Sequence, residues 1–148
     1  MWFPIDCNVL VHASGEGMRE YAEASYELLR NLEGRRDFVL AIDYKRKILR
    51  EYEGRIRAPM FAHHWLTRLH PERIRAVRKL RIPKGALVEL LEARLHKKDH
   101  MYVEAAYGAD KVLVTADFTS FSATVITILH RSLGIAVLSP QEALRTVA

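Results

Sequence analysis

The chain has 148 residues, of which 49% are hydrophobic and 28% charged, and its formal net charge at pH 7 is +5. This length suits one domain with a single core, and no apolar stretch approaches the roughly 18 residues that span a bilayer. The composition therefore excludes a transmembrane protein and favours a polyanionic partner. We expect one domain over residues 1–148 and, because the N-terminus carries no secretion signal, a cytoplasmic location.

The first half of the chain alternates short apolar runs with stretches of helical periodicity, which predicts a βαβ unit followed by helices. Asp43 is the expected N-cap of one helix, and Cys7 is expected in the first strand as a small buried side chain. In chain order, the predicted elements are a strand at 2–6, a helix at 18–32 ended by Gly34, a strand at 37–42, and helices at 43–56, 58–69 and 71–80.

The second half repeats this alternation, and its apolar runs are continuous, as in parallel strands buried on both faces. Ser139 and Pro140 are expected to open the last helix. The predicted elements here are helices at 83–95 and 98–109, a strand at 111–117, a helix at 121–133, a strand at 134–139 and the last helix. The whole pattern predicts a three-layer α/β/α fold with a mostly parallel central sheet.

Four carboxylates are expected to meet at one edge of that sheet. Asp6 and Asp117 each close a predicted strand, and ligand sites of such sheets lie beyond the carboxyl ends of the strands. Glu51 borders the apolar face of its helix, and Asp99 heads a stripe of apolar residues on a later helix. Repulsion among converging carboxylates is relieved by a cation, and an all-oxygen site suits Mg²⁺ or Mn²⁺.

Three of these acids also have purely structural interpretations. Asp99 could cap a helix, Asp117 could stabilise a turn, and Glu51 could pair with Lys47 or Arg55. Asp6 has no such alternative, because its neighbours are apolar or small and an unpaired buried carboxylate is costly.

The ordered segments IDCNVL, ILREYE and KDHMYVEAAYGADKVLVTAD resemble the PIN domain, a family of metal-dependent ribonucleases that includes many toxins of toxin–antitoxin pairs. The resemblance spans nearly the whole chain. It implies that Asp6, Glu51, Asp99 and Asp117 form an acidic metal site, with Asn8 and Thr115 supporting it by hydrogen bonds. Thr119 departs from the pattern, because family members often have a further acid there.

The resemblance implies an endoribonuclease that hydrolyses RNA phosphodiester bonds with Mg²⁺ or Mn²⁺, with an antitoxin protein and a homodimer as further partners. A PIN-like domain that binds RNA or protein without cutting is the alternative. A phosphate-accepting receiver domain and a haloacid-dehalogenase-like phosphatase fit less well, because Asn8 stands where a second acid is needed.

A basic block supports an RNA partner, because Lys and Arg side chains bind the phosphate backbone without sequence preference. Its alternative is an ordinary solvated surface. Tyr44 and Trp65 could stack on bases, although core packing is the simpler expectation for each. The predicted RNA-binding residues are Lys45, Lys47, Arg50, Arg73, Arg75, Arg78, Lys79, Arg81 and Lys84.

Overall fold

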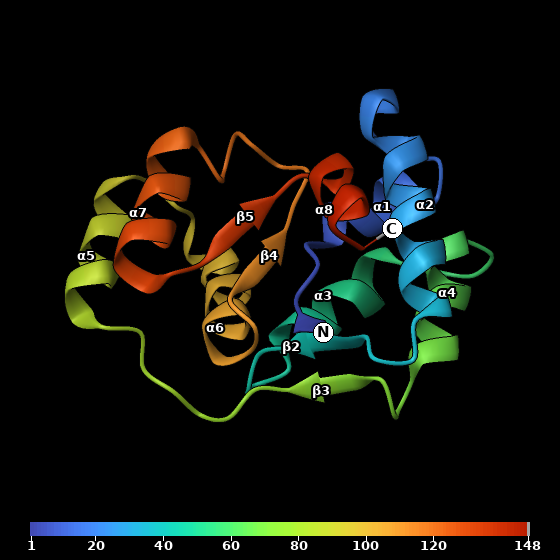
Figure 1. Cartoon of the computed structure of the whole chain (residues 1–148), viewed down its shortest axis with the longest axis horizontal. Helices are drawn as coiled ribbons and strands as arrows, with labels where there is room; N and C mark the ends of the chain where they lie inside the picture. Colours follow the sequence, from blue (N-terminus) through green and yellow to red (C-terminus); the bar gives the residue numbers. More distant parts are fainter. Residues whose placement is uncertain (148) are drawn as a thin grey trace.

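The computed structural model describes residues 1–147 and shows an α/β fold with parallel strands (Figure 1). Its elements are β1 (Trp2–Phe3), α1 (Cys7–Ala13), α2 (Arg19–Gly34), β2 (Val39–Ile42), α3 (Lys47–Arg55), α4 (Phe61–Leu69), β3 (Ile74–Ala76), α5 (Lys84–Glu92), the 3₁₀ helix η1 (Lys97–Asp99), α6 (His100–Gly108), β4 (Val112–Val114), α7 (Ala123–Leu133), β5 (Ala136–Leu138) and α8 (Pro140–Val147).

The strands form two parallel groups that a single bridge joins. One group has the order β1-β2-β3 and the other pairs β4 with β5. Beyond β1, Ile5 forms a parallel bridge with Val114, and the Asp6 backbone N–H donates to the Val114 carbonyl oxygen at 2.8 Å. The strands therefore follow one another in space as 3-2-1-4-5.

This strand order places a topological switch point between β1 and β4. From the centre, the chain moves outward through β2 and β3 on one side and through β5 on the other. In Figure 1, α5, α6 and α7 gather around β4 and β5, whereas α1, α2 and α4 lie with the first strands. A ligand crevice is expected where the order reverses.

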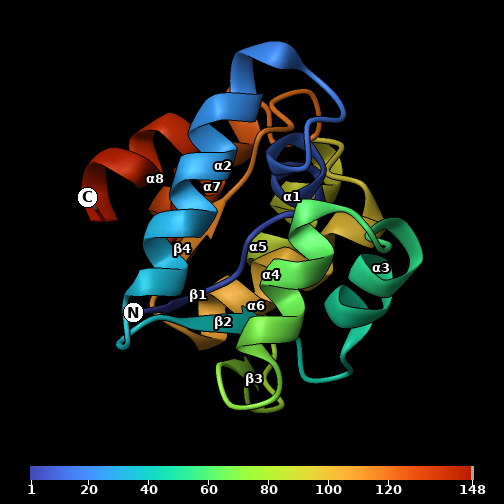
Figure 2. The ribbon, with the colours of Figure 1, turned by 90° about the vertical axis from the view of Figure 1, so that its right-hand side faces the viewer.

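One hydrophobic cluster of buried residues connects both groups of strands and the helices around them. Trp65, Tyr52, Tyr102 and Phe38 are among its largest fully buried side chains. In the view of Figure 2, helices lie on either side of β1 and β2, so these strands run through the interior. Within residues 1–147, no helix is both long and apolar enough to cross a membrane.

The first strand is shorter than the sequence suggested. Asp6 does not lie in it but occupies the N-cap position of α1, and Cys7 begins that helix instead of belonging to a strand. Pro4 and Ile5 of the predicted strand lie outside β1, and of these two only Ile5 makes a further bridge. Cys7 is buried as expected, and burial raises the pKa of its thiol to about 12, so the sulfur stays protonated.

The helix predicted at 71–80 is wrong, because this segment contains strand β3. Leu40, Ala41 and Ile42 of β2 pair with Ile74, Arg75 and Ala76 in parallel register. Arg75 points outward while Ile74 and Ala76 are half-buried, which is the alternation of an edge strand. Tertiary pairing with β2 outweighs the weak helical pattern here.

The remaining predicted elements are present, but some are shorter than predicted: the strand expected at 111–117 covers only Val112–Val114, so Asp117 lies beyond its end, and the helix expected at 43–56 begins at Lys47. Asp43 lies four residues before α3 starts, yet its carboxylate accepts the N–H groups of Lys47 and Ile48 at 3.1 and 2.8 Å and so caps that helix. Ser139 caps α8 by accepting the Glu142 N–H at 3.1 Å. Both results agree with the N-cap preference of Asp and Ser.

Candidate functional site

Asp6 lies at the switch point, between the end of β1 and the start of α1. Its side chain is only 5% exposed and makes no cap hydrogen bond to its own helix. One carboxylate oxygen, Oδ2, instead accepts a hydrogen bond from Thr115 Oγ1 at 2.8 Å. Asp6 is therefore attached to the end of β4, the strand on the other side of the switch point.

Asn8 and Thr115 make the kind of hydrogen bonds predicted for them. Asn8 Oδ1 accepts the Ala116 N–H at 3.2 Å, which ties α1 to the end of β4. Thr115 is fully buried, and its hydroxyl oxygen also accepts the Asp117 N–H at 3.0 Å. Thr115 thus contacts both Asp6 and Asp117, and it holds them at neighbouring strand ends.

Asp117 follows β4, and its side chain also stabilises the turn that leads toward α7. Its Oδ1 accepts the N–H groups of Thr119 and Ser120 at 3.2 and 3.0 Å. The turn interpretation of Asp117 is thereby confirmed. Neither bond uses Oδ2, so a second function of this carboxylate is compatible with the turn.

Glu51 extends from α3 toward Tyr102 of α6. Its Oε1 accepts a hydrogen bond from the Tyr102 hydroxyl at 2.9 Å and lies 3.7 Å from Arg55 Nη1, so the predicted helical pair with Arg55 is present. The Tyr102 oxygen in turn accepts the Cys7 N–H at 3.1 Å. Tyr102 therefore connects Glu51 to the peptide that follows Asp6.

Sequence reasoning missed Tyr102 as part of this site. The side chain is fully buried, and burial raises the pKa of its hydroxyl well above the usual value, so it stays protonated and donates. The available signal was a tyrosine three residues after Asp99 within an apolar stripe, because a buried tyrosine hydroxyl needs a partner. The sequence could not identify that partner as Glu51, which lies 51 residues away along the chain.

Asp99 occupies the junction between η1 and α6 and is 7% exposed. It occupies the N-cap position of α6 and the first turn of η1, so the helix-capping interpretation is confirmed for its position, although its side chain makes no cap hydrogen bond. Its Oδ2 is buried and has no hydrogen-bond partner among the described residues. A buried carboxylate oxygen without a partner is costly, which makes this atom a candidate ligand.

Burial and neighbouring acids act on the pKa of two of the four carboxyl groups, those of Asp6 and Asp99. Burial is the main cause that raises the pKa of Asp6 from 3.8 to about 7; Asp99 and Glu51 raise it further, whereas the Thr115 hydrogen bond lowers it. Burial likewise raises the pKa of Asp99, and Asp117 and Glu51 add to that effect. Thr115 links Asp6 to the Asp117 backbone, and Tyr102 links Glu51 to the peptide that follows Asp6, near the carboxyl ends of β1 and β4. That the four acids form one metal site stays a prediction.

The donor set suits a hard divalent cation in its chemistry. All four side chains offer carboxylate oxygens, and the unpartnered Oδ2 of Asp99 lacks the positive charge that such an ion supplies. Among residues 1–147, however, no three His, Cys, Asp or Glu side chains are already grouped closely enough to hold a metal ion. The acids would have to adjust their side chains around an ion.

The predicted RNA-binding residues divide into three groups. Arg73 is structural, because its guanidinium donates to the carbonyl oxygens of Phe38, Glu33, Leu32 and Arg35 and so closes the end of α2. Arg75 and Arg50 are exposed, but each already contacts another residue of the protein. The Arg75 guanidinium carbon lies 5.6 Å from the Trp2 ring centre, and Arg50 Nη2 donates to the Lys45 carbonyl at 3.0 Å. The third group is exposed and lines two adjoining grooves: Lys45, Lys47, Arg78, Lys79, Arg81 and Lys84.

The two aromatic residues considered for base stacking, Trp65 and Tyr44, differ in burial. Trp65 is fully buried, and its indole N–H donates to the Leu29 carbonyl at 2.8 Å, so it is a core residue. Tyr44 is 53% exposed and lies beside Lys45 in the groove. The core interpretation is therefore confirmed for Trp65 and wrong for Tyr44.

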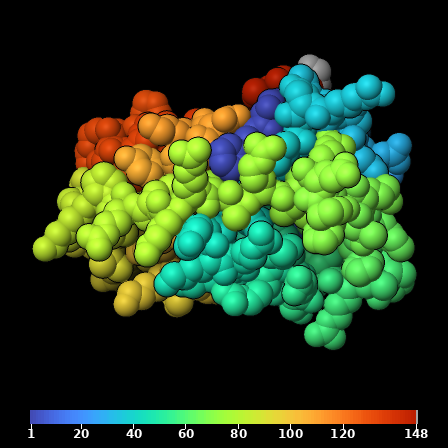
Figure 3. Space-filling model, turned by 90° about the horizontal axis from the view of Figure 1, so that it is seen from below, coloured from blue at the N-terminus to red at the C-terminus, as the bar shows by residue number. Residues whose placement is uncertain are grey.

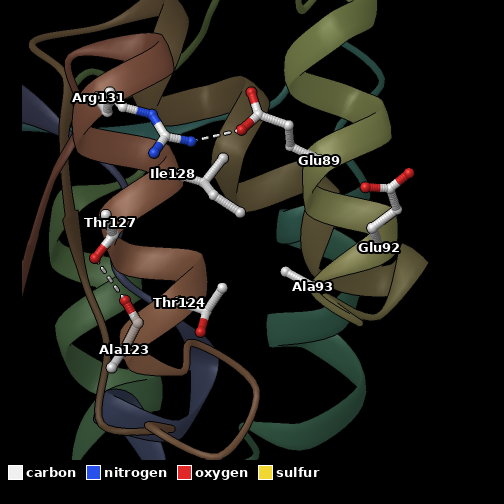
Figure 4. Close-up of a pocket in the computed structure, with 8 residues that line it drawn as sticks. All are labelled: Glu89, Glu92, Ala93, Ala123, Thr124, Thr127, Ile128 and Arg131. Carbon is white, nitrogen blue, oxygen red and sulfur yellow. Dashed lines mark hydrogen bonds and ion pairs between the residues drawn. The ribbon is translucent and has the colours of Figure 1, made fainter.

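A separate groove of about 540 Å³ opens between α5 and α7 (Figure 4). Arg131 Nη2 and Glu89 Oε2 form an ion pair across it at 2.6 Å, while Ala93 and Thr124 line its wider part. None of the four acids lines this groove. It therefore does not belong to the acidic site.

We compared the sequence with known proteins. It matches no protein-family model and no curated protein.

Proposed function

We propose that the protein is a PIN-like, metal-dependent endoribonuclease. The observation that best supports the proposal is that Asp6 and Asp117, linked through Thr115, and Glu51, linked through Tyr102, lie near the switch point of a 3-2-1-4-5 parallel sheet. The buried, unpartnered Oδ2 of Asp99 adds to it. The order of the four acids along the chain and their supporting residues Asn8 and Thr115 agree with the resemblance to that family. The exposed basic groove at the ends of β2 and β3 would supply the RNA-binding surface.

In this proposal, each residue has a definite task. Asp6, Asp99 and Asp117 hold one or two Mg²⁺ or Mn²⁺ ions, and Glu51 holds an ion or orients the attacking water. When bound, such an ion lowers the pKa of a water molecule and neutralises charge on the phosphate under attack. Thr115 keeps Asp6 and Asp117 at a fixed separation, and Tyr102 keeps Glu51 in position.

A second candidate is a PIN-like domain that binds RNA or a protein without cutting. One observation favours it: the carboxylates of Asp117 and Glu51 already have protein partners, namely the Thr119 and Ser120 N–H groups and the Tyr102 hydroxyl with Arg55. In a nuclease, a bound ion competes with these protein contacts for the carboxylate oxygens. In a domain that only binds, nothing competes with them.

Cleavage of a mixed pool of single-stranded and structured RNA tests the two candidates. We expect cutting in Mn²⁺ or Mg²⁺, none in EDTA, and a loss of roughly 1000-fold in Asp6→Asn, since the loss of a metal-binding carboxylate removes several kcal/mol of transition-state stabilisation. The matched control is Asp110→Asn, because the Asp110 carboxylate accepts the Trp2 N–H near the opposite ends of the strands. Equal activity of Asp6→Asn and the parent would show that the assigned site is wrong, and binding without cutting would favour the second candidate.

A further inference from the structure

The groove lined by Lys45 and Lys47 on one side and Arg78 and Lys79 on the other has a volume of about 230 Å³. In Figure 3, the yellow-green chain around residue 80 runs across this face beside the teal residues of the β2–α3 connection. All four basic side chains belong to exposed residues. Tyr44 also lines the groove and is one of the few large apolar side chains that stay substantially exposed in the described part of the chain.

Both walls of the groove are fixed by hydrogen bonds within the protein. The first wall is held by the Asp43 carboxylate, which accepts the N–H groups of Lys47 and Ile48. The second wall is held to the end of β2 by the Val77 N–H, which donates to the Ile42 carbonyl at 2.9 Å. The groove therefore exists before any ligand arrives, which lowers the entropic cost of binding.

The floor of the groove is held against α6. A Cβ added to Gly108 would lie 2.5 Å from Leu80 Cδ2 and 2.8 Å from Val77 Cβ, so the absence of a side chain lets both residues pack closely there. Val77 and Leu80 give the groove an apolar floor beneath the positive charges. Such a combination suits a nucleotide, which has an apolar base face and an anionic phosphate.

The groove adjoins the acidic site. Lys47 stands one helical turn before Glu51 on α3, and residues at that spacing share a face. The strand ends that form the groove, those of β2 and β3, are next in order to the end of β1 that carries Asp6. Glu104 of α6 also lines the groove, so four positive charges face one acid and the balance favours an anion.

We propose that Tyr44, Lys45, Lys47, Arg78 and Lys79 form a nucleotide-binding subsite, in which a base stacks on the Tyr44 ring and the adjacent phosphates contact the four basic side chains. The subsite holds an unpaired stretch of strand beside the acidic site, because a base within a duplex has no free face for Tyr44. The inference rests on the proposed function only in taking RNA as the ligand.

Binding can be measured without cleavage, by the fluorescence anisotropy of a labelled ten-nucleotide oligouridine in EDTA at about 50 mM salt, where phosphate contacts are strong. We expect Tyr44→Ala to weaken binding by roughly 5- to 100-fold because the base no longer stacks, and Tyr44→Phe to bind like the parent. Lys79→Glu should weaken binding. It should also make the negative slope of log affinity against log salt less steep, by about 0.7 for each phosphate that the protein no longer neutralises.

Two control variants test whether the effect belongs to the groove. Tyr26→Ala removes another exposed tyrosine, 40% exposed on α2, and Arg145→Glu reverses an exposed charge on α8. Both should bind the oligonucleotide as the parent does. Binding of Tyr44→Ala and Lys79→Glu within twofold of the parent would overturn the subsite, as would equal affinity of the parent for a blunt RNA duplex.

This outcome is separable from that of the proposed function. If the oligouridine binds through Tyr44 but the RNA pool is not cut in Mn²⁺, the subsite stands and the nuclease proposal fails. If the pool is cut through Asp6 while Tyr44→Ala changes neither the affinity in EDTA nor the KM for cleavage, the nuclease stands and the subsite fails.

Discussion

The two charged regions at the strand ends differ in how their charges are held. In the acidic region, at the ends of β1 and β4, two carboxylates are buried and two are half-buried, and three of the four have protein partners such as Thr115 and Tyr102. The basic region, at the ends of β2 and β3, is exposed, and several of its side chains have no partner within the described chain. Burial makes the acids sensitive to protonation and position, whereas the exposed cations act mainly through net charge.

The largest expected consequence of burying the acids is a change of the free energy of unfolding with pH. Folded Asp6 keeps its proton up to about pH 7, whereas an unfolded aspartate releases it near 3.8. The folded state therefore binds more protons between these values, so the free energy of unfolding falls as pH rises from about 4 to about 7. For Asp6 alone the fall is at most about 4 kcal/mol, and the raised pKa of Asp99 acts in the same direction.

Urea denaturation in EDTA at acidic pH, near the unfolded pKa, and again at mildly alkaline pH measures this fall. Asp6→Asn should lose most of it and should be more stable than the parent at alkaline pH, because no buried charge forms. Adding Mn²⁺ at that pH should stabilise the parent more than the variant. A variant whose stability follows the same pH curve as the parent would contradict the assignment of the buried charge to Asp6.

The basic block itself contains a second contrast, between Arg73 and Arg75. Arg73→Ala should lower the free energy of unfolding by about 2 to 3 kcal/mol, because four carbonyl oxygens at the end of α2 no longer have a charged donor. Arg75→Ala should cost under about 1 kcal/mol, since it removes only an exposed cation–π interaction with the Trp2 ring. Both are measured by urea denaturation at neutral pH.

The same pair of variants should leave oligouridine binding within about twofold of the parent at equal salt, because neither side chain lines the groove. If Arg73→Ala were as stable as Arg75→Ala, its guanidinium would not close α2. A large loss of RNA affinity in the folded Arg73→Ala protein would instead return this residue to the RNA-binding set.

The contrast between the regions also explains what the sequence can and cannot predict. The positions of Asp6 and Asp117 near strand ends are predictable, because periodicity identifies the buried parallel strands that precede them. Glu51 and Asp99 lie on helical segments, so their positions depend on how those segments pack. The functions of the arginines are not predictable, since Arg73 and Arg75 are two residues apart in one strand region and differ only in their partners. Those partners follow from the pairing of β3 with β2, whereas the sequence pattern of 71–80 indicates a helix.

The errors at Asp6 and Tyr102 also arise because a local sequence pattern does not show contacts with distant residues. The apolar neighbours of Asp6 suggest a strand, yet the chain turns into α1 one residue later. Tyr102 carries no local sign of its partner, since Glu51 and the Cys7 N–H are both distant in sequence. Pairing across long sequence separations is set by packing, which one sequence alone does not reveal.

The smallest effect expected concerns the hydrogen bonds that position the acids. Tyr102→Phe removes the donor to Glu51 and the acceptor of the Cys7 N–H, so it should lower kcat for Mn²⁺-dependent RNA cleavage by roughly tenfold, about 1.4 kcal/mol, with KM little changed. Tyr52→Phe is the matched control, because Tyr52 is equally buried but donates to the Ile5 carbonyl rather than to a carboxylate.

Both phenylalanine variants should lose stability, Tyr52→Phe through one missing hydrogen bond and Tyr102→Phe through two, at about 1 kcal/mol each, so a loss of stability alone does not show that Tyr102 acts in the acidic site. Catalysis does, because only Tyr102 holds a carboxylate of the acidic site. A roughly tenfold loss of kcat in Tyr102→Phe with near-parental kcat in Tyr52→Phe would identify Tyr102 as a positioning residue for Glu51. Equal losses in both variants would show that the buried tyrosines act through the fold, and that Glu51 keeps its place without the Tyr102 hydroxyl.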